Sequence, residues 1–107
     1  MPSASLVLYT GIMTTAHALI VDDERDIREL LSLSLGRMGL SAATAGTLAE
    51  AKALLDTQRF DICLTDMRLP DGNGLALIEH AVRHFPHMPI AMVTAFGDVQ
   101  SAVGALK

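Results

Sequence analysis

Residues 60–74 read FDICLTDMRLPDGNG and join a short apolar run to an acid and a turn. The apolar run at 62–64 is typical of a strand that is buried on both faces of a parallel sheet. Asp66 follows at the carboxyl end of this strand, the end at which open α/β sheets bind ligands. Residues 70–74 predict a turn, because proline fixes φ and because Gly and Asn accept positive φ. The stretch predicts a carboxylate at a rigid strand end, although a single Asp there could also serve only to cap the loop.

Four short apolar runs alternate with helical patterns along the chain. The runs at 17–21, 40–45, 62–64 and 89–93 predict strands. The apolar stripes of the predicted helices are formed by Ile27, Leu30, Leu31, Leu35 and Met38, then Leu48, Ala51, Leu54 and Leu55, then Ile78, Val82 and Phe85, and lastly Val99, Val103 and Leu106. Gly39 is expected to end the first helix, and Thr47 with Glu50 forms a capping box that opens the second. The order βαβαβαβα predicts an α/β fold, a doubly wound parallel sheet with right-handed crossovers.

Composition limits the classes of function. The chain of 107 residues is long enough for one domain with a real core, and its net charge of −4, without a basic patch, argues against direct nucleic-acid binding. No apolar run approaches the roughly 18 residues of a transmembrane helix, so no membrane association is expected. Cys63 is the single cysteine, expected to be a buried hydrophobe in a reducing, cytoplasmic setting. Residues 1–14 are interpreted as a leader of unknown role, and 15–107 as the domain.

Polar side chains follow three of the predicted strands. Asp22 and Asp23 follow the first strand, Asp66 the third and Thr94 the fourth. Because the carboxyl ends of parallel strands lie side by side, three carboxylates converge, and their repulsion needs a cation. Hard oxygen ligands suit Mg²⁺, which would let a carboxylate attack a phosphoryl group while Thr94 donates its hydroxyl to it. Asp22 or Asp23 could instead simply cap the first helix, and one of them is expected to do so in addition to binding the metal, because acids are favoured at a helix start. The four histidines of the chain show no metal-ligand spacing.

Three motifs now carry a resemblance to a family. VDDE at 21–24, LTDMRLPDGNG at 64–74 and VTAFGD at 93–98 resemble the receiver domain of two-component response regulators, over residues 17–107. The residues around Asp66 and at 94–98 are similar to those of receivers in the sigma-54 activator group, including type IV pilus regulators. The resemblance implies a flavodoxin-like sheet of order 2-1-3-4, with the family's fifth strand and helix missing from this chain.

The resemblance also implies a role for each site residue. Asp66 corresponds to the phosphate acceptor for a sensor histidine kinase, and Thr94 to the switch hydroxyl. Asp22 and Asp23 correspond to the acidic pair that serves Mg²⁺, with the main-chain carbonyl of Arg68 as a further ligand. The chain would then be a signalling module of a phosphorelay, at most a weak autophosphatase, that signals to an output domain regulating transcription.

The chain departs from the family at its carboxyl end. A receiver carries a Lys after its fifth strand, which stabilises the transferring phosphoryl group, and Lys107 stands in the wrong place for it. The domain at 15–107 is therefore expected to be incomplete, with the strand at 89–93 as a bare edge through which the chain self-associates.

Three alternative functions remain open. An inert truncated receiver would not accept phosphate. A Mg²⁺-dependent aspartyl phosphatase would carry an acid two residues after its nucleophile, where this chain has Arg68. A flavin or nucleotide binder would carry a phosphate-binding loop after the first strand, where this chain has acids at 22–24.

Overall fold

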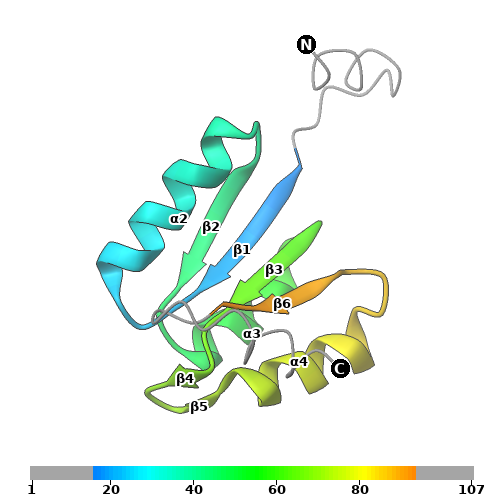
Figure 1. Ribbon diagram of the computed structural model, residues 1–107. Helices are drawn as coiled ribbons and strands as arrows, with labels where there is room; N and C mark the ends of the chain where they lie inside the picture. The colour runs from blue at the N-terminus through cyan, green and yellow to red at the C-terminus, as the bar shows by residue number, and fades with distance from the viewer. Residues whose placement is uncertain (1–15, 94–107) are drawn as a thin grey trace.

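The computed structural model describes residues 16–93, and Figure 1 shows their arrangement. Its elements in chain order are β1 His17–Val21, α2 Arg25–Arg37, β2 Ser41–Ala45, α3 Leu48–Thr57, β3 Ile62–Thr65, β4 Arg68–Leu69, β5 Gly72–Asn73, α4 Gly74–His84 and β6 Ile90–Met92. All four predicted strands are confirmed to within one residue at each end, and helices are present at the first three predicted helical segments. The predicted fourth helix and residues 1–14 lie outside the described part. None of the described helices is long and apolar enough to cross a membrane.

The main sheet has the strand order β2-β1-β3-β6, with every neighbouring pair parallel. Since β6 is the predicted fourth strand, the expected order 2-1-3-4 is confirmed. The helix α2 packs along β1 and β2 on one side of the sheet, while α3 and α4 pack together on the other (Figure 1). In the register, Val21 of β1 lies beside Thr65 of β3, and Thr65 lies beside Met92 of β6. The carboxyl ends of these three strands therefore meet at one edge.

The main core lies between the sheet and the helices α3 and α4. Its buried members are Leu19, Val21, Ala45, Leu48, Ala51, Leu55, Phe60, Cys63, Leu69 and Leu77. Residues 18–21 of β1 are all at most 1% exposed, so both faces of this central strand are covered. Burial raises the pKa of the Cys63 thiol to about 12, so the thiol stays protonated and unreactive, in agreement with its interpretation as a buried hydrophobe.

The apolar stripes of α2 and α4 are only partly confirmed. No residue of α2 is fully buried, and Leu30 and Met38 are 59% and 69% exposed. In α4 the buried residues are Gly74, Leu77 and Ala81, whereas Val82, predicted to face the sheet, is 62% exposed. The prediction for Val82 was wrong because residues 75–78 are all apolar, so periodicity alone did not define the rotation of this helix.

The predicted turn at 70–74 is the tip of a small antiparallel hairpin. Its strands β4 and β5 pair Arg68 with Asn73 and Leu69 with Gly72. The Asn73 side chain accepts a hydrogen bond from the Ala76 amide at 2.9 Å and so caps α4. The hairpin therefore leads directly from the end of β3 into the first turn of α4.

Two helix boundaries follow the rules read from the sequence. Gly39, after α2, has a φ of +88°, as expected of a residue that ends a helix in the left-handed region. Thr47 caps α3, because its hydroxyl accepts a hydrogen bond from the Glu50 amide at 3.0 Å. The return contact of the capping box differs, since the Glu50 carboxylate accepts from the Gly46 amide at 3.3 Å.

Candidate functional site

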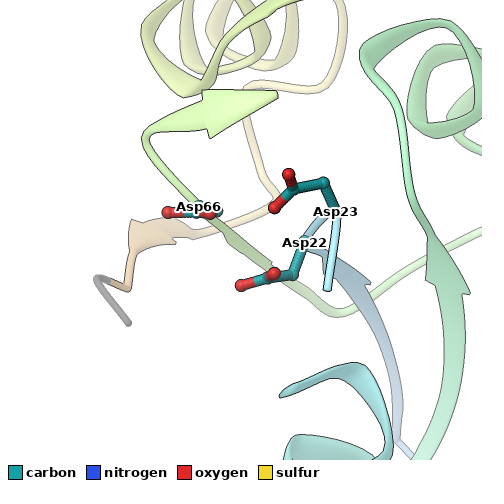
Figure 2. A group of neighbouring side chains, drawn as sticks. All are labelled: Asp22, Asp23 and Asp66. Carbon is teal, nitrogen blue, oxygen red and sulfur yellow. The ribbon is translucent and has the colours of Figure 1, made fainter. Parts of the chain in front are cut away.

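Three carboxylates meet at the carboxyl edge of the sheet. One oxygen from each of Asp22, Asp23 and Asp66 lies within 4.8 Å of the others, and Figure 2 shows the three side chains converging. The sheet causes this convergence: Asp66 follows β3, and its amide donates a hydrogen bond to the carbonyl of Val21, the last residue of β1, at 2.8 Å. The convergence predicted from the strand ends is therefore confirmed as geometry.

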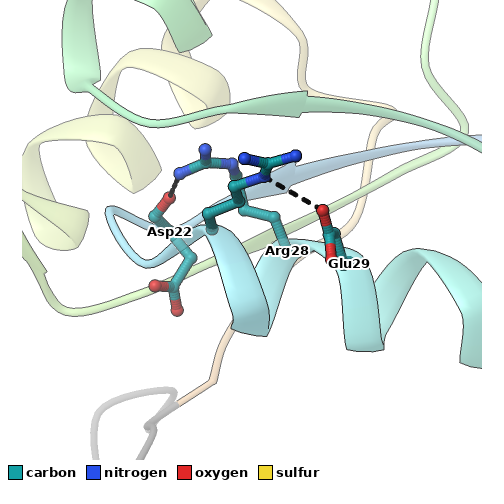
Figure 3. A network of polar contacts seen from close by, with 4 residues as sticks. Asp22, Arg28 and Glu29 are labelled. Atoms are coloured by element: carbon teal, nitrogen blue, oxygen red, sulfur yellow. Dashed lines mark hydrogen bonds and ion pairs between the residues drawn. The ribbon is translucent and has the colours of Figure 1, made fainter.

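Three hydrogen bonds hold Asp22 in place, two on its main chain and one on its carboxylate. Its amide donates to the Ala45 carbonyl at 3.0 Å, and its carboxylate accepts from the Glu24 amide at 2.8 Å. In Figure 3, Arg28 reaches back from α2 so that its Nη1 donates to the Asp22 carbonyl at 2.8 Å. The N-cap of α2 is Glu24, without a side-chain cap, so the prediction that Asp22 or Asp23 caps this helix is wrong.

The cluster carries negative charge without a cationic partner in the described part of the chain. Asp22 is only 4% exposed, and burial raises the pKa of its carboxyl above the usual value. The bond from the Glu24 amide lowers that pKa in part, while the charges of Asp66 and Asp23 raise it further. Arg28 bonds the Asp22 carbonyl rather than its carboxylate, and the ion pair within residues 16–93 joins Arg25 to Glu29 at 3.0 Å. An acidic oxygen cluster of this kind fits a hard divalent cation such as Mg²⁺.

Asp66 sits on a tightly packed main chain. Its Oδ1 accepts a hydrogen bond from the Met67 amide at 2.7 Å, and the buried Thr65 hydroxyl donates to the Asp66 carbonyl at 3.0 Å. Gly74, the first residue of α4, donates its amide to the Met67 carbonyl at 2.7 Å. A Cβ on Gly74 would overlap the Asp66 carbonyl oxygen. The sequence predicted that the glycines of this turn, including Gly74, adopt positive φ. Within residues 16–93, however, only Gly39 has a positive φ. At position 74 glycine is required instead because there is no room for a side chain.

Of the two remaining predicted site residues, Arg68 lies within the described part of the chain and Thr94 lies outside it. Arg68 begins β4, two residues after Asp66, with its side chain exposed. Thr94 lies outside the described residues; Val93 before it donates its amide to the Thr65 carbonyl at 2.8 Å. The roles of Arg68 and Thr94 stay predictions.

The histidines of the described chain lie apart from the carboxylates. His17 is at the amino end of β1, where its ring stacks on Phe60 and bonds Ser41 and Gln58. The rings of His80 and His84 lie side by side on α4, tilted by 48° with 4.6 Å between their centroids. Within residues 16–93, the three aspartates form the one cluster with metal-ligand spacing.

Sequence reasoning missed one acid that the hairpin places against α3. The carboxylate of Asp71 accepts hydrogen bonds from the Leu48 and Ala49 amides at 2.7 and 2.9 Å. The only available signal was general: the first amides of any helix need hydrogen-bond acceptors from outside the helix. Nothing local to residue 48 indicates an acceptor 23 residues away.

Comparison with known proteins agrees with this arrangement. The sequence matches the response regulator receiver domain family over residues 18–107. It is 53% identical over 95 residues to the response regulator protein PilR of Pseudomonas aeruginosa, covering 89% of this chain and 21% of PilR. It is 38% identical over 95 residues to the DNA-binding transcriptional regulator NtrC of Klebsiella pneumoniae, covering 89% of this chain and 20% of NtrC.

A solved structure shares the fold. The beryllofluoride-activated NtrC4 receiver domain dimer superposes with a TM-score of 0.73 at 33% identity, covering 84% of this chain and 74% of that one. The chain spans about a fifth of the length of the curated relatives it matches. These relatives are sigma-54 activator-type regulators. With its flavodoxin-like sheet and acidic edge, the chain belongs to the receiver domain family of two-component response regulators.

Proposed function

We propose that this chain is the phosphoacceptor module of a two-component phosphorelay, which takes a phosphoryl group from a sensor histidine kinase onto Asp66 in the presence of Mg²⁺. The observation that carries the proposal is the approach of Asp22, Asp23 and Asp66 to within 4.8 Å of one another at the carboxyl edge of the sheet. Membership of the receiver family supports it, because receivers are signalling domains rather than conventional enzymes.

The proposed transfer assigns a task to each atom of the Asp66 carboxylate. Oδ1 accepts from the Met67 amide, and Oδ2 has no hydrogen-bond partner among residues 16–93, so Oδ2 is assigned as the attacking oxygen. A new O–P bond forms there while the bond between phosphorus and the donor breaks, and the leaving group keeps that electron pair. Bound Mg²⁺ would screen the repulsion between the carboxylate and the phosphoryl oxygens.

The other site residues would hold the ion and the transferred group. Asp22 and Asp23 would share the ion with Asp66 and with the main-chain carbonyl of Arg68. Thr94 would donate its hydroxyl to a phosphoryl oxygen and act as the switch. Burial of Asp22 beside two like charges supports this assignment, because a divalent ion would offset the cost of ionising all three acids.

The partners are proposed on the same basis. A sensor histidine kinase would supply the phosphoryl group, and an output domain of a longer parent protein would regulate transcription, as the regulator relatives suggest. Self-association through the strand β6 also stays a prediction. Within the described chain β6 pairs with β3 alone, and the solved NtrC4 receiver is a dimer.

Phosphorylation by a small donor tests the function directly. The chain is incubated with acetyl phosphate with Mg²⁺ or with EDTA, and the intact mass is measured. We expect one phosphoryl adduct, stable in acid and labile in base, that requires Mg²⁺. An absent adduct in Mg²⁺ would contradict the proposal and favour an inert receiver, whereas steady phosphate release without an adduct would favour a phosphatase.

Asp23→Asn is expected to weaken Mg²⁺ binding by at least about ten-fold, because it removes a charged oxygen ligand from a site that leaves the ion partly hydrated and weakly held. Calorimetric titration of the wild-type and variant chains measures this. Asp26→Asn is the matched control, because Asp26 is an exposed acid in the first turn of α2 outside the cluster. Equal affinities for wild type and Asp23→Asn would remove Asp23 from the site.

A further inference from the structure

The acid at the tip of the β4–β5 hairpin makes a long-range contact that the proposed function does not use. Asp71 is exposed, yet its Oδ1 accepts a hydrogen bond from the Leu48 amide at 2.7 Å and its Oδ2 accepts one from the Ala49 amide at 2.9 Å. Both amides lie in the first turn of α3, where backbone donors have no helical acceptor. The Asp71 carboxylate therefore bridges the hairpin tip to α3 through two charge-assisted hydrogen bonds.

The hairpin tip is docked on α3 by packing as well as by these bonds. A Cβ on Gly72 would come within 2.8 Å of the Leu48 side chain, so the main chain after Asp71 lies directly against α3. The hydrogen bonds from the Leu48 and Ala49 amides also lower the pKa of the Asp71 carboxyl, because they favour its ionised form. The tip and the start of α3 therefore form one contact, in which Asp71 supplies the polar part.

This contact restrains the segment that carries the proposed phosphoacceptor. The hairpin starts at Arg68, two residues after Asp66, and returns at Asn73, which pairs with Arg68 and caps α4. The next residue, Gly74, bonds the Met67 carbonyl at 2.7 Å. The main chain between Asp66 and α4 thus has two anchors, one on Met67 and one at the tip through Asp71.

We propose that Asp71 is a positioning residue of the acidic site. By tying the hairpin tip to the first turn of α3, it holds the main chain around Asp66 and Arg68 in the geometry that binds a divalent cation. The inference rests on the proposed function. The positioning role of Asp71 can be distinguished from a purely structural one. A residue that only stabilised α3 would affect folding and leave the cation affinity unchanged.

The chain offers a matched control at the same helix end. Thr47 also caps α3, through its bond from the Glu50 amide, but none of its hydrogen bonds reaches the hairpin. Thr47→Ala therefore weakens the start of α3 while leaving the hairpin tip attached. Asp71→Ala weakens both. Asp71→Asn keeps one carbonyl acceptor and loses the charge, so its effect should be intermediate.

The experiment measures Mg²⁺ affinity by calorimetric titration, thermal unfolding midpoints, and amide hydrogen exchange, on the 107-residue wild type and the three variants. Asp71→Ala is expected to weaken Mg²⁺ binding by roughly 3- to 10-fold, at or below the low end of effects seen for residues that support metal ligands. It should also speed exchange of the amides at 67–69. Thr47→Ala should lower the midpoint by roughly 5 °C and keep the affinity within about two-fold of wild type.

The outcomes distinguish a failure of the positioning role from a failure of the proposed function. If wild type binds Mg²⁺ and Asp71→Ala binds it equally well, the positioning role is overturned and the function stands. If Thr47→Ala weakens binding as much as Asp71→Ala, the effect runs through α3 stability and the inference is again overturned. If wild type binds no Mg²⁺, both fall. Should Asp71→Ala not fold, the affinity of Asp71→Asn decides, and a wild-type value overturns the role.

Discussion

Asp66→Asn is expected to reduce phosphorylation by acetyl phosphate to background. The amide has no charged oxygen to form the O–P bond, so the covalent step loses its nucleophile rather than part of its efficiency. Asp66 is the acid that stands at the end of β3, with one carboxylate oxygen held by the Met67 amide and its main chain fixed to Val21. Mass spectrometry of the chain after incubation with donor and Mg²⁺ measures the loss.

Two controls distinguish loss of the nucleophile from loss of the fold. Asp56→Asn changes an exposed acid near the end of α3, and its adduct should equal that of wild type. Asp66→Asn itself should unfold in the absence of Mg²⁺ at a temperature no lower than wild type, because it removes one of three mutually repelling charges. An adduct that survives in Asp66→Asn would assign the acceptor to another residue, with Asp22 and Asp23 the next candidates.

Gly74→Ala is expected to give the second-largest effect, on stability and phosphorylation together. A Cβ at this position would overlap the Asp66 carbonyl oxygen and lie 3.3 Å from the Met67 Cα, and both are backbone atoms that cannot rotate away. Either α4 or the acceptor segment must move, at a cost of about 3 kcal/mol, at the upper end for overpacked buried sites. For a domain of this size, that loss lowers the unfolding midpoint by roughly 10–20 °C.

Gly36→Ala is the matched substitution for this test. Gly36 lies within α2 and a Cβ there meets nothing within 4 Å, so alanine should raise stability by about 0.5–1 kcal/mol through its better helix propensity. Thermal unfolding followed by circular dichroism compares the two variants with wild type. A Gly74→Ala chain that melts with wild type and is phosphorylated at the same rate would show that the contact with Asp66 is not required.

Much of the fold was predictable because the relevant signals are local. A buried parallel strand needs only a few consecutive apolar residues, as at 62–64. The start of helix α3 is indicated by Thr47 and Glu50, which stand three positions apart. The convergence of the three carboxylates also followed, since residues just after neighbouring parallel strands must share an edge. Helix α4 shows the limit: four consecutive apolar residues fit several rotations, and the wrong one was inferred for Val82.

By itself, the sequence determined the alternation of strands and helices and which acids stand at strand ends, because hydrophobic period and turn chemistry act over a few residues. Only the tertiary structure decided which face α4 buries, why Gly74 cannot carry a side chain, and where the Asp71 carboxylate binds. These features depend on distances between segments that the fold brings together, such as the 23 residues between Leu48 and Asp71. No periodicity encodes such a distance, since it is set when α3, the hairpin and α4 pack on one face of the sheet.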